Sequence, residues 1–67
     1  MEDNLKIVFS ADSRYKTNII QEILAENNIK SMRLDQKGSA LLLGEIHILV
    51  NEKDEKKALD IITNHEI

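Results

Sequence analysis

The chain has 67 residues and no cysteine, so we expect a single domain over residues 1–67 whose small core can be reinforced by self-association but not by disulfides or zinc. Twelve acidic residues outnumber nine basic ones, and only Phe9 and Tyr15 are aromatic, which argues against a nucleic-acid-binding surface. The acidic segment 1–4 is unlike a secretory signal, and no apolar run approaches the roughly 20 residues that span a bilayer, so we expect a soluble cytoplasmic protein without membrane contact.

Residues 5–10 alternate in a way that predicts a first strand with one buried face. The buried face would carry Leu5, Ile7 and Phe9, and the outward face Lys6, Val8 and Ser10.

The next segment repeats apolar residues at helical spacing and predicts a helix that ends near Asn27. Its start can be capped by a side-chain oxygen of Ser10, Asp12 or Ser13. Its apolar stripe consists of Tyr15, Ile19, Ile20, Ile23 and Leu24. Asn28 is expected to end the helix, because Asn tolerates the left-handed conformation that closes many helices.

Two further strands and a second helix are predicted in the rest of the chain. Residues 29–35 form the second strand, with Met32 and Leu34 on one face and Ser31, Arg33 and Asp35 on the other. Residues 45–50 form the third strand, in which Ile46, Ile48 and Val50 alternate with Glu45, His47 and Leu49. Asn51 can cap a helix over residues 52–64, whose apolar side consists of Ala58, Ile61 and Ile62.

The two predicted helices have to cover one face of the three-stranded sheet, because no other element can bury their apolar stripes. We therefore expect a two-layer α+β fold in the order strand, helix, strand, strand, helix. A right-handed first crossover with the third strand inserted between the other two gives the sheet order 1-3-2, with that strand antiparallel to both neighbours. This arrangement is a truncated ferredoxin-like fold.

Several short segments carry a resemblance to a known family. They are Val8-Phe9-Ser10 before the first helix, Ile23-Leu24 and Asn28-Ile29 at its end, Leu43-Gly44-Glu45 before the third strand, and Glu52-Lys53-Asp54-Glu55 with Lys57-Ala58 after Val50. Through them nearly the whole chain resembles the bacterial family of putative prokaryotic signal transducing proteins, whose fold is similar to that of the nitrogen-regulatory signalling proteins. The nitrogen-regulatory proteins bind nucleotide and a keto acid through a long loop, whereas residues 36–44 are too few for such a loop, so that activity is not carried over.

The residues offer no assembled catalytic site, and we expect neither an enzyme nor a bound cofactor or metal. The only histidines are His47 and His65, and two histidines so far apart lack the spacing of a zinc site. His65 lies in a fraying turn near the C-terminus. His47 shares a strand face with Glu45, but an open strand provides neither a pocket nor an oxyanion site, so a solvated histidine on the sheet is expected.

Two surfaces are candidates for binding a partner. The first is the sheet face without helices, where Val8 and Leu49 would form a small apolar patch with a basic rim; its expected residues are Lys6, Val8, Ser31, Arg33, His47 and Leu49. The second is the run Leu41, Leu42 and Leu43, of which a regular strand would bury only alternate members. These leucines either cover the end of the core or form a contact surface.

The expected function is that of a small regulatory or adaptor domain in signal transduction. It would bind an unidentified protein, or a second copy of itself as a homodimer, through the sheet face, the leucine run or the exposed edge of the first strand. The alternative is a sensor of small metabolites, in which Lys6, Arg33 and His47 select an anionic ligand.

Overall fold

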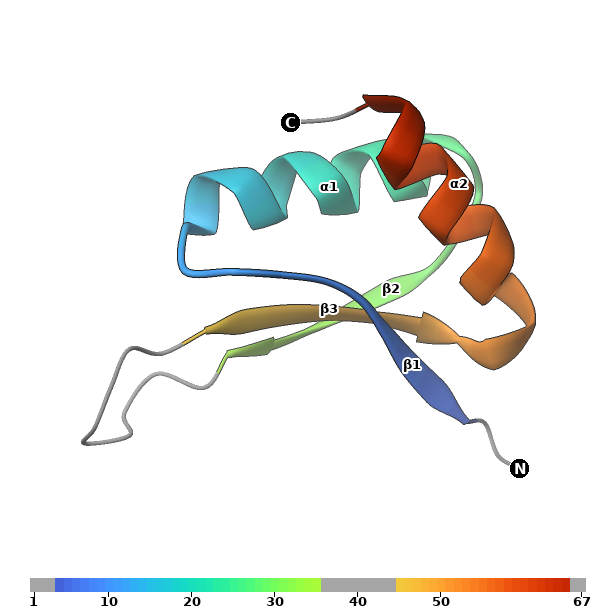
Figure 1. Ribbon diagram of the computed structural model, residues 1–67, viewed down its shortest axis with the longest axis horizontal. Coiled ribbons are helices and arrows are strands. Elements are labelled where there is room, and N and C mark those ends of the chain that lie inside the picture. The colour runs from blue at the N-terminus through green and yellow to red at the C-terminus, as the bar shows by residue number, and fades with distance from the viewer. Residues whose placement is uncertain (1–3, 36–44, 66–67) are drawn as a thin grey trace.

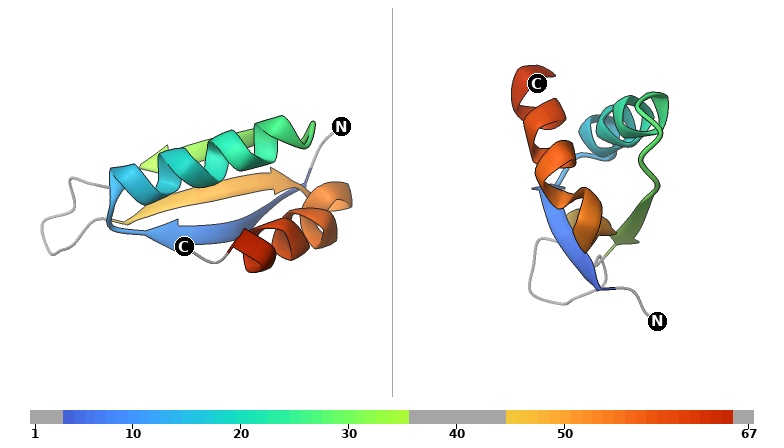
Figure 2. Two further views of the ribbon diagram at one scale, coloured as in Figure 1. Left: turned by 90° about the horizontal axis from the view of Figure 1, so that it is seen from above. Right: turned by 90° about the vertical axis from the view of Figure 1, so that its right-hand side faces the viewer.

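The elements follow one another in the order β1 (Leu5–Ala11), α1 (Arg14–Glu26), β2 (Ser31–Asp35), β3 (Ile46–Asn51), a short 3₁₀ helix η1 (Glu52–Asp54) and α2 (Glu55–His65). This order is that of a computed structural model, which describes residues 4–35 and 45–65 (Figure 1). The sheet has the order β1-β3-β2, with β3 antiparallel to both neighbours, and both helices lie on one side of it (Figures 1 and 2). The predicted two-layer α+β fold and its strand order are confirmed.

A β-bulge interrupts β1 at Val8. Ile7 pairs with Leu49 of β3 and Phe9 with Ile48, so the register skips Val8. Val8 and Phe9 therefore both lie opposite Ile48, and Ile7 lies on the other face of the sheet. Val8 is 8% exposed and belongs to the core, whereas Ile7 is 51% exposed. The predicted outward position of Val8 and buried position of Ile7 are wrong, because the bulge shifts the alternation by one residue.

β2 turns its polar side chains toward the helices. Ser31 and Arg33 pair with buried residues of β3, and paired residues of neighbouring strands share a face. Met32 and Leu34 lie on the opposite face and are exposed. The predicted burial of Met32 and Leu34, and the predicted outward position of Ser31 and Arg33, are therefore wrong.

Two hydrogen bonds to α1 explain this orientation of β2. Nε2 of Gln21 donates to Oγ of Ser31 over 3.0 Å, and Nη1 of Arg33 donates to Oδ1 of Asn18 over 2.8 Å. Because the part of α1 nearest to β2 is polar, it accommodates polar strand residues without leaving their groups unsatisfied.

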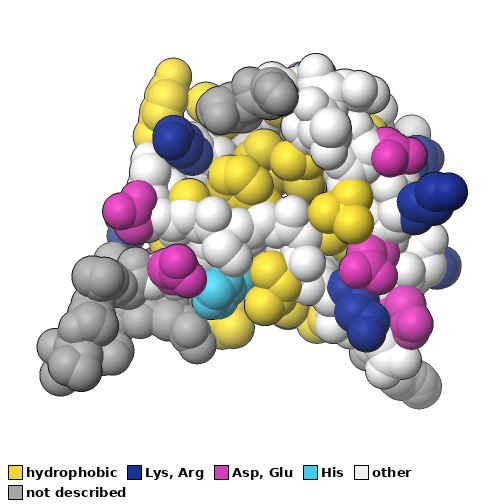
Figure 3. Space-filling model, viewed as in Figure 1, with side chains coloured by type: hydrophobic (Ala, Val, Ile, Leu, Met, Phe, Trp, Pro, Cys, Tyr) yellow, Lys and Arg dark blue, Asp and Glu magenta, His cyan; other side chains and the backbone are white. Residues whose placement is uncertain are grey.

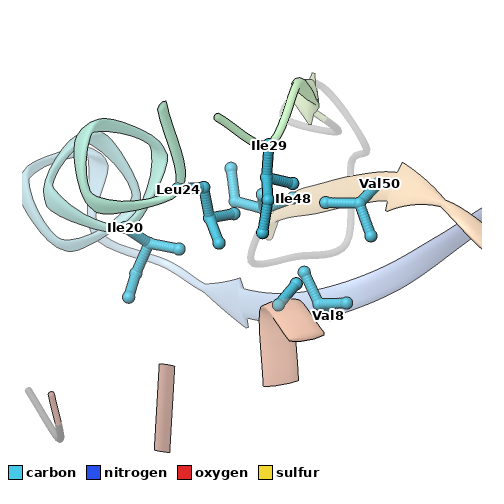
Figure 4. Packing of buried hydrophobic residues seen from close by; sticks show 7 residues of the cluster. Val8, Ile20, Leu24, Ile29, Ile48 and Val50 are labelled. Carbon is cyan, nitrogen blue, oxygen red and sulfur yellow. The ribbon is translucent and has the colours of Figure 1, made fainter. Parts of the chain in front are cut away.

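The core lies between the helices and the sheet (Figure 4). Ile20 and Leu24 of α1 and Ile48 of β3 have no exposed surface, and the side chains of these residues point toward one another. The same cluster also contains Val8, Ile29, Val50 and Ala58. Full burial of one such aliphatic side chain stabilises the fold by about 1.5–3 kcal/mol, so in a chain of this length a few residues decide which face of the sheet is covered.

The two ends of α1 are capped. Oγ of Ser13 accepts a hydrogen bond from an amide in the first turn, which identifies Ser13 as the cap among the three predicted candidates. At the other end Asn28 has a φ of 63°, and the amide of Ile29 donates to the carbonyl of Leu24 over 2.9 Å. This left-handed turn brings Ile29 into the core and leads the chain toward β2. The predicted terminator Asn28 and the predicted cap Asn51 are confirmed.

Val8 and Ile7 provide a direct test of the bulge. Replacing Val8 with Ala removes buried carbon atoms and should lower the free energy of unfolding by about 1–3 kcal/mol. Replacing Ile7 with Ala removes exposed atoms and should cost less than about 1 kcal/mol. Urea unfolding of both variants at low protein concentration, where self-association does not contribute, measures the difference. An equal or larger loss for Ile7→Ala would show that β1 follows an uninterrupted alternation.

Candidate functional site

The sheet face opposite the helices is covered by no described element (Figure 1), and we call it the open face. The pairing of β1 and β2 with β3 assigns to it Leu5, Ile7, Ser10, Met32, Leu34, His47, Leu49 and Asn51. All three strands therefore contribute to the same surface.

The middle row of the open face is entirely apolar. It consists of Ile7, Leu49 and Met32, one from each strand, and side chains paired in this way contact one another. Leu5 and Leu34 extend the row at diagonally opposite ends. Apart from the half-buried Leu49, these side chains are between 44% and 54% exposed. A continuous apolar patch on the surface of a small domain commonly marks an interaction site.

A hydrogen-bonded pair lies in the next row of the open face. Nδ1 of His47 lies 2.6 Å from Oγ of Ser10, across the pairing of β1 with β3. Leu34 occupies the position of β2 in this row. Because the two polar groups bond each other, a partner can cover the row with a smaller loss of hydrogen bonds to water.

The strand residues of the open face include no Lys, Arg, Asp or Glu, although 31% of the chain is charged. Figure 3 shows charged side chains toward both ends of the molecule, whereas hydrophobic side chains and a histidine lie along the lower margin, on the uncovered side of the sheet. Charged residues are depleted from the centres of protein interfaces. The strand residues of the open face share this depletion of charge with the centres of protein interfaces.

The open face contains only part of the predicted binding site. His47 and Leu49 lie on it, but Val8 lies in the core. Lys6 and Arg33 pair with buried residues of β3 and belong to the helix-covered side. An anion site made of Lys6, Arg33 and His47 would need all three on one face, and they are not. Leu41, Leu42 and Leu43 lie outside the described residues.

Both outer edges of the sheet carry features that hinder the addition of another strand. On β1, the bulge at Val8 disturbs the regular spacing of the backbone groups, and Lys6 lies on the helix-covered side. β2 has only five residues, and its Arg33 lies on the helix-covered side. Bulges, short edge strands and inward-pointing charges are the means by which proteins prevent edge-to-edge pairing. The edge of β1 is therefore poorly suited to the strand addition expected from the sequence.

A depression lies at the end of the sheet where β2 begins. It is lined by α1, by the turn into β2 and its first two residues, by Leu5 of β1, and by the end of β3 from Leu49 to Asn51. Because its lining comes from both faces of the sheet, the depression wraps around the sheet and lacks the enclosing walls of a small-molecule site. Ser10 and His47 do not line it.

Within residues 4–35 and 45–65, no three His, Asp or Glu side chains gather at a place where they could hold a metal ion. None of the helices in these two ranges has the length and apolar character needed to cross a bilayer.

Strict alternation misses four apolar residues of the open face, namely Leu5, Ile7, Met32 and Leu34. One signal for the bulge is present in the sequence. Ile7, Val8 and Phe9 are consecutive apolar residues, and an uninterrupted strand cannot turn two neighbours among them to the same face. For β2, the signal is the polar pair Asn18 and Gln21 on the predicted helix, which offers hydrogen-bonding partners to polar strand residues.

One of three comparisons with known proteins finds a match. A family model described as putative prokaryotic signal transducing protein matches residues 5–66, a range that includes every described strand and helix. No curated protein and no solved structure matches the chain. The chain belongs to the family of putative prokaryotic signal transducing proteins.

Proposed function

We propose that the protein is a small signal-transducing module that acts by docking a protein partner onto its open face. Membership of the family supports a role in signalling. The observation that carries the docking mode is the uncharged, apolar surface that all three strands build. The module would relay a signal by being bound or unbound, without a chemical step of its own.

The exposed apolar side chains of the open face can supply the free energy for docking. Full burial of a Leu, Ile or Met side chain is worth about 1.5–3 kcal/mol. Leu5, Ile7, Met32 and Leu34 still expose about half of their surface, so each can contribute on the order of 1 kcal/mol when a partner covers it. The entropy lost on association costs at least about as much as these four side chains contribute, so burial of the partner's own apolar surface has to add to the sum and the contact is expected to be weak and reversible.

The pair of Ser10 and His47 fits a docking face better than a catalytic site. Its hydroxyl and imidazole, 2.6 Å apart, are the groups from which a nucleophile and its base are built. Catalysis also needs a pocket and donors for the developing negative charge. The pair lies on an open sheet face beside Leu34 and outside the depression at β2. We therefore assign it to partner binding and propose that the protein is not an enzyme.

Site-specific photo-crosslinking in cells that produce the protein tests the docking surface. A photoreactive phenylalanine analogue replaces Leu49 at the centre of the open face or, as a control, Leu59, which is exposed on α2. We expect discrete protein adducts from position 49 and none from position 59. Adding Ile7→Asp to the first variant should abolish the adducts, because burial of an unpaired charge is unfavourable. Equal adducts from both positions, or none from position 49, would refute docking at the open face.

The variant Arg33→Val tests whether the edge of β2 is protected. It removes the charge on the helix-covered side and the hydrogen bond to Asn18, and valine favours strands. We expect faster aggregation, detected by light scattering, with a gain of β-structure in circular dichroism. Lys30→Val, just before β2, should leave the protein monodisperse. If Arg33→Val also stays monodisperse, Arg33 does not protect the edge of β2 against strand addition. Docking of a partner at this edge then becomes a competing mode.

A further inference from the structure

We propose that the partner which fits the open face is a second copy of this chain, in a two-fold symmetric dimer whose sheets pack face to face. This proposal rests on the proposed function and names its partner. In a two-fold dimer the same surface patch is used by both subunits, so the patch has to be complementary to itself.

The lack of charge makes the open face complementary to itself. Each copy carries a net charge of −3, and two copies therefore repel each other at long range. None of the open-face strand residues is charged, however, and Lys6, Arg33 and Asp35 all belong to the helix-covered side. No like charges from the paired strand residues would meet at the contact. Charged partners are selected by complementary charge, which these strand residues do not offer, whereas an apolar patch fits its own copy.

Leu49 is the residue expected to meet its own counterpart in such a dimer. It lies on the central strand and in the middle row, between Ile7 and Met32. A two-fold axis that runs between the sheets through the centre of the patch brings Leu49 next to the partner subunit's Leu49. This holds whether the axis runs along β3 or across the strands, although the contacts of the surrounding residues, such as Ile7 and Met32, differ between the two arrangements.

The size of the open face predicts a weak dimer. Three strands about 4.8 Å apart, with about six residues of about 3.3 Å each, cover roughly 300 Å² in projection. Stable complexes bury about 800 Å² on each partner. We therefore expect a dissociation constant between about 10 μM and 1 mM, so that dimer and monomer interconvert as the local concentration changes.

Thiol cross-linking tests the predicted geometry. Because the chain has no cysteine, Leu49→Cys and Leu59→Cys each carry a single thiol, the second on α2. Packed sheets lie about 10 Å apart, which suits a bismaleimide of that length and is too far for a direct disulfide. We expect cross-linked dimers of Leu49→Cys that increase with protein concentration and exceed those of Leu59→Cys by about tenfold, a ratio that corresponds to about 1.4 kcal/mol.

Sedimentation equilibrium on the unsubstituted protein, up to millimolar concentration, measures the dissociation constant. Met32→Asp should raise this constant by at least about tenfold, whereas Leu59→Asp should leave it unchanged. Circular dichroism verifies that both variants are folded.

A monomer at millimolar concentration, or equal cross-linking at positions 49 and 59, overturns the second copy as the partner. If photo-crosslinking at Leu49 then identifies a different protein, the proposed function stands and only its partner changes. If photo-crosslinking at Leu49 also yields no adduct, the proposed function falls as well.

Discussion

β3 is the strand from which every other element takes its position. Among the described strands it alone is paired on both edges, and its residues alternate between the buried Ile46, Ile48 and Val50 and the half-buried His47 and Leu49. α1 packs above this strand through side chains that are completely buried. Hydrophobic burial is the dominant stabilising effect in folding, and a chain of this length has little of it. The contact of α1 with β3 therefore determines which face becomes the core and which face is left open.

The helix-covered side is held in two different ways on either side of β3. Toward β1, the half-buried Phe9, Ile61 and Ile62 pack against the core. Toward β2, hydrogen bonds from Gln21 to Ser31 and from Arg33 to Asn18 replace apolar packing. Each hydrogen bond makes a modest net contribution of about 0.5–1.5 kcal/mol. Both bonds, however, specify which side chains of β2 point toward α1. They orient β2 so that its apolar residues lie on the open face.

The order of the elements and the orientation of β3 could be predicted, because its alternation is regular and because a right-handed first crossover with the third strand inserted between the other two gives the observed sheet order. His47 and Leu49 were placed correctly for this reason. The orientation of the edge strands could not be predicted in the same way. The bulge in β1 depends on Val8 and Phe9 both fitting beneath the helices, which is a tertiary contact. β2 is short enough to alternate equally well in either phase, and its phase is chosen by polar residues of α1.

The bulge at Val8 divides a strand of seven residues into two segments, whose residues alternate between the two faces of the sheet in opposite phase. Before the bulge, Leu5 and Ile7 lie on the open face, and after it Phe9 and Ala11 pair with buried residues of β3 while Ser10 returns to the open face. Under the proposed function, substitutions of Leu5, Ile7 or Ser10 alter what the domain recognises, while Phe9 and Ala11 preserve the fold. Deletion of Val8 would remove the bulge and one core side chain, and the remaining residues of β1 could keep their present partners on β3. Recognition and stability can thus evolve independently along one short stretch of backbone.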